Sequence, residues 1–243
     1  MKARTNGSLY DTAVGEADGG VGVFVRSWLP APPARVLEIG CGEGSLALAL
    51  AGEGWRVSAV DPAAPEGEPF IREAIEDLDP AAHGPFDAAV AVLSLHHLEE
   101  IGMALDGIRA LLRPGAIFVV DEFGKEELED AATAAYSYHQ RLALLHGGHG
   151  PANPGAGAVH EEDSFEIWRS RLGHKRQHIH EGRRILTALE ARFEGREFAS
   201  GPFLFREEMA PDLEPLERRL IQGGGIRPVG FRWVGAAWRD PRG

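Results

Sequence analysis

The stretch RVLEIGCGEGSLALALA, residues 35–51, limits the fold of this chain more than any other segment. It consists of a short apolar run, a turn with three glycines, and a helix-like series of leucines and alanines. Such a turn places unpaired backbone N–H groups and the positive end of a helix beside a ligand, while the missing side chains let that ligand reach the main chain. We therefore expect a cofactor to bind over Gly40, Gly42 and Gly44.

The residues around this turn indicate which cofactor it binds. The dinucleotide fingerprint G-x-G-x-x-G requires a glycine where this chain has Ser45, and the third glycine comes one residue early. Glu38, just before the turn, would repel a pyrophosphate but suits a ligand with an ammonium group. S-adenosylmethionine has that ammonium group, a carboxylate for the helix end and no phosphate. It is the predicted cofactor, and NAD is the second choice.

From residue 35 onward, strand-like and helix-like segments alternate, which predicts an α/β fold with a doubly wound, mostly parallel, seven-stranded sheet. The expected helices cover residues 45–52 and 101–112, and the expected strands cover residues 35–39, 56–60, 70–75, 86–92, 116–121, 196–205 and 231–238. Only PAAPEGEP separates the second strand from the third, so we expect the crossover helix there to be lost or reduced to a turn.

The pattern divides the chain into four parts. These are an N-terminal helical flap and linker (1–34), a cofactor-binding core (35–123), a helical lid inserted after the fifth strand (124–194) and the last core strands (195–243). Within the lid, one helical face is predicted to be apolar from the three- and four-residue spacing of Leu128, Ala132, Ala135, His139, Leu142 and His146.

In residues 35–123 the sequence resembles the class I S-adenosylmethionine-dependent methyltransferases, with four motifs in the family's order. VLEIGCGEG is similar to the family's first motif, VSAVDP to its second-strand end, and AIEDLD to its adenine-contacting segment. FDAAVAVLSLHHL and LLRPGAIFVVDEF match its fourth strand and the turn into its fifth. The shortened connection after Asp61 departs from the family pattern.

The resemblance implies a set of cofactor-binding positions. Asp61 would take both ribose hydroxyls, and Asp77 with the Leu78 amide would contact the adenine. The full set implied is Glu38, Gly40, Cys41, Gly42, Asp61, Pro62, Glu76, Asp77, Leu78 and Leu93.

Three residues are candidates for catalysis. His96 follows the fourth strand at the rim where ligands bind in open α/β sheets, and Glu122 ends the fifth strand. His139 lies within the predicted lid stripe. Histidine is the usual base near neutral pH. For each residue a structural role is the alternative: a turn histidine for His96, a helix-start acid for Glu122 and a buried neutral histidine for His139.

Composition restricts the remaining classes. A net charge of −12 disfavours nucleic-acid substrates. Cys41 is the only cysteine, which excludes an internal disulfide and fits a reducing cytoplasm. We find no signal peptide or membrane span. No metal is expected either, because His174, His178 and His180 have no carboxylate partner at a recognisable spacing.

We therefore predict a cytoplasmic methyltransferase that acts on an oxygen or nitrogen of a small molecule. Lysine occurs only at positions 2, 125 and 175, and alanine and glycine are abundant, as in GC-rich genomes. By analogy, a natural-product intermediate is the expected acceptor. The alternatives are a cofactor-binding protein without methyl transfer and a NAD-dependent oxidoreductase. The sequence does not indicate an oligomeric state.

Overall fold

The computed structural model describes residues 20–146, 159–160, 163–207 and 210–238. These residues form two compact units. The first comprises the chain up to residue 122 together with residues 185–198 and the chain from 232 onward. The second comprises residues 123–184 and 199–231. The predicted helix of the N-terminal flap is present as α2 (Val21–Trp28), whereas residues 1–19 lie outside the described residues.

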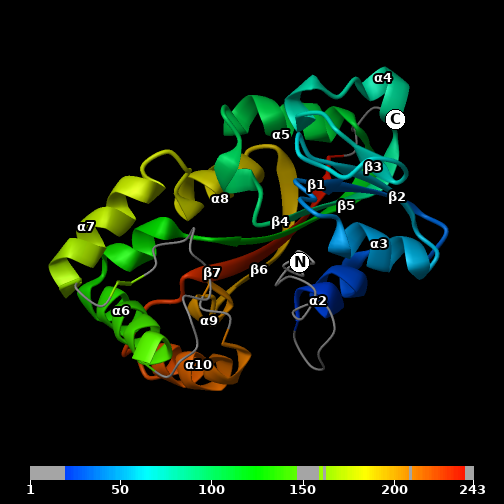
Figure 1. Cartoon of the computed structure of the whole chain (residues 1–243). Helices are drawn as coiled ribbons and strands as arrows, with labels where there is room; N and C mark the ends of the chain where they lie inside the picture. The colour runs from blue at the N-terminus through cyan, green and yellow to red at the C-terminus, as the bar shows by residue number, and fades with distance from the viewer. Residues whose placement is uncertain (1–19, 147–158, 161–162, 208–209, 239–243) are drawn as a thin grey trace, which may run out of the picture. The chain divides into compact units, whose positions relative to one another are not determined.

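A seven-stranded sheet in the order β3-β2-β1-β4-β5-β7-β6 confirms the predicted α/β fold (Figure 1). Its strands are β1 (Arg35–Ile39), β2 (Arg56–Val60), β3 (Phe70–Ile71), β4 (Phe86–Val92), β5 (Leu112–Phe123), β6 (Phe193–Gly201) and β7 (Gly230–Ala237). The pairs β3-β2, β2-β1, β1-β4 and β4-β5 are parallel. The sheet as a whole is mixed.

The strand register brings distant residues to one edge of the sheet. Ile39 at the end of β1 pairs with Val60 of β2 and with Ala91 of β4. Val92 of β4 pairs with Asp121 of β5. Because these strands are parallel, the residues that follow each of them emerge at the same carboxyl edge, where open α/β sheets bind ligands.

Helices cover both faces of the sheet in the first unit. The helix α3 (Ser45–Gly52) shares a buried cluster with α2 and with apolar side chains of the sheet. This cluster contains Val21, Val25, Val36, Leu46, Leu50, Val90, Val119 and Val234. The helices α5 (Ile101–Ala110) and α8 (Gly182–Glu190) lie on the opposite side (Figure 1). Three short turns complete the unit: η1 (Ile75–Asp77), α4 (Pro80–His83) and η2 (Leu95–His97).

The loss of the crossover helix between β2 and β3 is confirmed. Residues 61–69 contain only turns and bends, and β3 pairs with β2 over Ala59↔Phe70 and Val60↔Ile71. A strand this short needs only a short connection, which is how the chain avoids the long crossover that parallel strands normally require. The predicted strand 70–75 was too long, because the chain turns into η1 at Ile75.

The element boundaries near Pro114 were also wrong. We predicted a helix up to residue 112, but α5 ends at Ala110 and β5 begins at Leu112. The register against β4 shifts between the pairs Phe86↔Leu112 and Ala88↔Ile117. The turn RPG is therefore an irregularity inside the strand, the place where a sheet tolerates proline. The late strands begin earlier than predicted, at residues 193 and 230.

The second unit is mostly helical. It contains η3 (Lys125–Glu129), α6 (Ala131–His146), α7 (Phe165–Arg176), α9 (Leu204–Glu207), η4 (Pro211–Leu213) and α10 (Glu214–Gln222). Residues 199–231 contribute to this unit alongside residues 123–184, and the role of residues 124–194 as a lid stays a prediction. Among the described residues, no helix combines the length and hydropathy needed to cross a membrane.

The apolar stripe predicted for this region is wrong. The buried residues of α6 are Thr133, Ala134, Ser137, Tyr138 and Arg141. His139 and Ala132 are exposed, and Leu142 is only partly buried. The buried face is rotated away from the predicted one, because Arg141 is buried through an ion pair with Glu207, a partner that helical periodicity cannot reveal.

Candidate active site

The three glycines of the first turn all have left-handed backbone conformations, but they serve different neighbours. A Cβ atom on Gly40 (φ +68°) would lie 2.3 Å from the Cβ of Ser94, and one on Gly44 (φ +83°) would lie 2.1 Å from Phe70 Cε1. A Cβ atom on Gly42 (φ +53°) would meet nothing within 4 Å. Gly40 and Gly44 therefore allow close packing, whereas Gly42 faces open space beside the backbone, as the cofactor-binding prediction requires.

Glu38 is a buried acid with one unsatisfied oxygen. Its side chain lies at the end of β1, its residue is 4% exposed, and Oε2 has no hydrogen-bond partner among the described residues. Burial raises the pKa of this carboxyl to about 8; the amide of Ala47 opposes the rise and the charge of Asp61 adds to it. A buried acceptor without a partner fits a cationic ligand group such as an ammonium.

Asp61 joins the glycine turn to the end of β2. Its Oδ2 accepts a hydrogen bond from the Gly42 amide at 3.0 Å, and its Oδ1 accepts one from the Ala63 amide at 2.7 Å. Each carboxylate oxygen has a second lone pair, so Asp61 retains acceptor capacity for hydroxyl groups. Its ribose contact stays a prediction.

Cys41 lies between Gly40 and Gly42 and is buried. Burial and the charges of Glu38 and Asp61 raise the pKa of its thiol to about 12. The thiolate is therefore disfavoured, and Cys41 is suited to packing beside the cofactor turn rather than to nucleophilic attack.

The end of β4 carries a strained residue. Leu93 has φ +51°, the only non-glycine residue with a positive φ among the described residues, and its amide donates to the Asp121 carbonyl at 2.9 Å. Ser94 follows it, and its hydroxyl donates to the Ile39 carbonyl at 2.7 Å. Strain of this kind concentrates at functional sites. It fits the predicted cofactor contact at Leu93, which the structure does not test.

His96 and Glu122 form a buried pair at the same edge. The Nδ1 atom of His96 lies 3.0 Å and 2.9 Å from the two carboxylate oxygens of Glu122, which is fully buried. The His96 amide also points to Oε1, at 3.3 Å. His97 is exposed, and its ring centroid lies 4.1 Å from that of His96. Partial desolvation and the neighbouring His96 lower the pKa of His97.

The remaining predicted cofactor residues lie around the β2 and β3 ends. Pro62 follows Asp61 and is exposed. Glu76 and Asp77 are exposed on η1, whereas Leu78 is buried. Their contacts with the adenine stay predictions.

Two histidine features of the second unit are separate from this edge. His139 is exposed on α6, and its ring packs against Tyr138 with centroids 5.3 Å apart. Among the described residues, no three His, Cys, Asp or Glu side chains gather as metal ligands.

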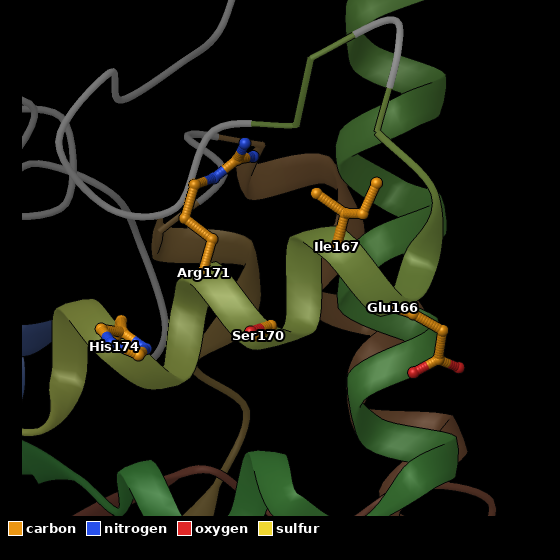
Figure 2. A pocket seen from close by; sticks show the side chains of 5 residues that line it. All are labelled: Glu166, Ile167, Ser170, Arg171 and His174. Atoms are coloured by element: carbon orange, nitrogen blue, oxygen red, sulfur yellow. The ribbon is translucent and has the colours of Figure 1, made fainter.

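The outward face of α7 forms an open hollow lined by Glu166, Ile167, Ser170, Arg171 and His174 (Figure 2). Glu166 and Arg171 point in different directions there (Figure 2). This surface has no convergent polar groups of the kind that orient a ligand.

Comparison with known proteins decides the family. The family model described as "Methyltransferase domain" matches residues 24–198. This match covers more than half of the chain. The chain belongs to this methyltransferase family. The resemblance to class I S-adenosylmethionine-dependent methyltransferases is thereby confirmed, and S-adenosylmethionine is the cofactor of the class.

Curated relatives cover part of the methyltransferase. A ubiquinone biosynthesis O-methyltransferase of Xylella fastidiosa is 33% identical over 116 residues, which is 42% of this chain and 47% of that protein. An S-adenosyl-L-methionine-dependent Diels-Alderase of Talaromyces variabilis is 30% identical over 147 residues, 53% of this chain and 50% of that protein. The chain thus spans about half the length of the curated relatives it matches.

Solved structures share the fold of the methyltransferase. The 1,6-didemethyltoxoflavin-N1-methyltransferase of Burkholderia thailandensis superposes with a TM-score of 0.51 at 18% identity, covering 96% of this chain and 80% of that one. A methyltransferase of Methanosarcina mazei gives a TM-score of 0.51 at 19% identity, with 89% and 98% covered.

Sequence reasoning missed two residues of the methyltransferase site. Ser94 supports Gly40 and bonds to the β1 end, and Phe70 packs against Gly44. A small polar residue directly after a buried strand was the available signal for Ser94. Nothing near Phe70 indicated its contact, because the contact depends on how β3 lies beside β2.

Proposed function

We propose that the protein transfers a methyl group from S-adenosylmethionine to an oxygen or nitrogen atom of a small molecule. One observation carries the proposal: a turn shaped for a cofactor and a buried histidine–carboxylate pair lie at the same edge of one sheet. The turn supplies open backbone at Gly42 and the unsatisfied carboxylate oxygen of Glu38. The pair His96–Glu122 supplies a group that can accept a proton.

The chemistry asks little of the protein beyond alignment. When bound, S-adenosylmethionine supplies an electrophilic methyl group on a sulfonium centre. The chain's own residues must align the acceptor with that methyl and exclude water. An oxygen or nitrogen acceptor that carries a proton also needs a base.

The geometry favours His96 as that base. A carboxylate within hydrogen-bond distance of Nδ1 holds the proton on that nitrogen, which makes Nε2 the proton-accepting atom. Glu122 is then a positioning residue: it fixes the ring orientation and stabilises the imidazolium that forms, as carboxylates do beside catalytic histidines elsewhere. His139 remains a second candidate, on the exposed face of α6.

The acceptor class rests on the relatives. The Xylella protein is named as an O-methyltransferase of ubiquinone biosynthesis, which favours an oxygen acceptor. The acidic composition supports a small molecule over a nucleic acid, because nucleic-acid binding needs clustered positive charge.

A product-blind assay tests the proposal. Purified protein is incubated with S-adenosylmethionine and panels of phenols, carboxylic acids and amines, and released S-adenosylhomocysteine is measured. Release that depends on the acceptor and is lost in a His96→Ala variant supports the proposal. Tight cofactor binding with no release for any acceptor contradicts it.

A second function is favoured by one relative. The Talaromyces protein is named as an S-adenosyl-L-methionine-dependent Diels-Alderase, so a related chain is named for a different reaction. The corresponding alternative is a protein that binds the cofactor without transferring its methyl group. In that case S-adenosylhomocysteine would bind, and no acceptor would produce turnover.

A further inference from the structure

Arg176 is the last residue of α7 and is nearly enclosed within the second unit. Its side chain is 12% exposed. The guanidinium lies over the ring of Phe123, with Cζ 5.4 Å from the centroid, and Nη2 donates to Oε1 of Glu207 at 2.5 Å. Burial and the like charge of Arg141 lower the pKa of Arg176, whereas Glu207 opposes this.

Half of the Arg176 guanidinium is unused. Its Nη1 atom is buried and has no hydrogen-bond partner among the described residues. A planar guanidinium presents paired N–H donors that match the two oxygens of a carboxylate. A buried donor without a partner is rare in native structures and calls for a specific explanation, such as a bound ligand.

The surroundings of Arg176 are positively charged. Glu207 is shared, because its Oε2 accepts from Arg141 Nη2 at 2.9 Å while its Oε1 accepts from Arg176. The ammonium of Lys125 donates to the carbonyls of Arg176 and Ile179, at 2.7 Å and 2.5 Å. Three cationic side chains thus gather within one segment of the unit.

A second unsatisfied atom lies on the adjacent turn. The Nε2 atom of His180 is buried and also lacks a hydrogen-bond partner among the described residues. Because Lys125 holds the carbonyls of both Arg176 and Ile179, the chain between α7 and α8 is folded around its ammonium. Arg176 and His180 therefore border one compact turn.

Apolar surface borders the same guanidinium. Phe123 stacks on Phe203 with centroids 4.8 Å apart and planes 9° apart. A ligand suited to this environment combines a carboxylate for the guanidinium with an apolar body for the stacked rings.

We propose that Arg176, beside the stacked rings of Phe123 and Phe203, binds the carboxylate of a small apolar acid in the second unit. This site is distinct from the cofactor turn. Its two arms of recognition are the unused Nη1 edge of Arg176 and the aromatic surface.

Calorimetry on the full chain, saturated with S-adenosylhomocysteine, tests the site with two probes of equal shape. Benzoate carries the carboxylate, and benzamide is its neutral counterpart. We expect benzoate to bind at least about 10-fold more tightly than benzamide, and Arg176→Gln to remove that preference. Arg183→Gln is the matched control, because its side chain is 70% exposed in the same unit. It should leave benzoate binding unchanged.

Three outcomes would overturn the proposal: no benzoate binding, equal binding of both probes, or an unchanged preference in Arg176→Gln. Inorganic phosphate binding in place of benzoate would also contradict a carboxylate site. If Arg176→Gln does not fold, Arg176→Lys replaces it. That variant keeps the charge but loses the paired donors, so benzoate binding should weaken and an unchanged affinity would refute the role of the fork. Failure of methyl transfer is read separately, from S-adenosylhomocysteine release.

Discussion

The Nδ1 atom of His96 lies within 3.0 Å of both carboxylate oxygens of Glu122, a pair formed by residues that follow two neighbouring parallel strands. If His96 is the base, His96→Ala should lower kcat by about 10²-fold to 10⁴-fold, the usual contribution of general base catalysis. Glu122→Gln should lower kcat less, because the ring survives. Acceptor-dependent release of S-adenosylhomocysteine measures both.

The exposed neighbour His97 provides the matched control for this pair. His97→Ala removes a histidine one residue away that no described carboxylate holds in a printed ion pair, and it should leave kcat within a few-fold. Loss of turnover in His97→Ala with retention in His96→Ala would exchange the two roles. Cofactor affinity should stay unchanged in all three variants.

Two glycine substitutions separate folding from cofactor binding. Both Gly40→Ala and Gly42→Ala carry the strain of a left-handed residue, about 1–2 kcal/mol. Only Gly40→Ala adds an overlap with Ser94 Cβ, at 2.3 Å, so it should lower the thermal stability further. Gly42→Ala projects a methyl group into open space and should mainly weaken cofactor binding. Thermal unfolding and calorimetry with S-adenosylhomocysteine distinguish them; equal stability of the two variants would contradict this assignment.

Much of the first unit could be predicted because its signals are local. The glycine turn, the buried strand before it and the helix after it all lie within residues 35–52, and the structure places β1 and α3 there with the predicted boundaries. The lost crossover helix was predictable for the same reason, since the connecting sequence is too short for one.

Features that depend on distant partners could not be predicted. The pairing of His96 with Glu122 depends on the β4-β5 register, in which Val92 lies beside Asp121. The buried face of α6 depends on Glu207, which pairs with Arg141 from across the second unit. Alanines occupy both faces of this helix and fit either of them, so the spacing of apolar residues had little power there.

Removing the Asp61 carboxylate should weaken cofactor binding first. Asp61→Ala deletes the predicted ribose acceptor and also the hydrogen bond from the Gly42 amide. We expect a loss of about 1–3 kcal/mol in binding free energy, or roughly 5-fold to 150-fold in affinity. Asp61→Asn keeps one acceptor oxygen and should lose less. Titration with S-adenosylhomocysteine measures both, and an unchanged affinity in Asp61→Ala would exclude a ribose contact.

His139→Ala tests the second candidate base. Its side chain is exposed, so the substitution should change the stability by less than about 0.5 kcal/mol, as is usual at the surface. If His139 takes part in catalysis, turnover falls while cofactor affinity stays within a few-fold. Gln140→Ala, at the next position of α6, is the control. Unchanged turnover in His139→Ala would remove this residue from the candidates and leave His96.

Glu38 should make the stability of the free protein depend on pH. Burial raises the pKa of its carboxyl from 4.5 to about 8, so the folded state holds this proton more tightly than the unfolded state does. The corresponding stabilisation is complete below pH 4.5 and is lost as the pH rises through 8. Each unit of pKa difference is worth about 1.4 kcal/mol. Glu38→Gln should abolish this alkaline loss, which thermal unfolding across the pH range would measure.

The same carboxyl should release its proton when the cofactor binds. An ammonium group beside Oε2 favours the ionised form, so binding near pH 7 should expel up to about one proton from Glu38. Calorimetry with S-adenosylhomocysteine in two buffers of different ionisation enthalpy reports this proton as a difference in apparent binding enthalpy. Glu38→Gln should show no such difference, whereas Asp61→Asn should bind more weakly and still show it. Equal enthalpies in the two buffers for the unmodified protein would mean that the ammonium does not lie against Glu38.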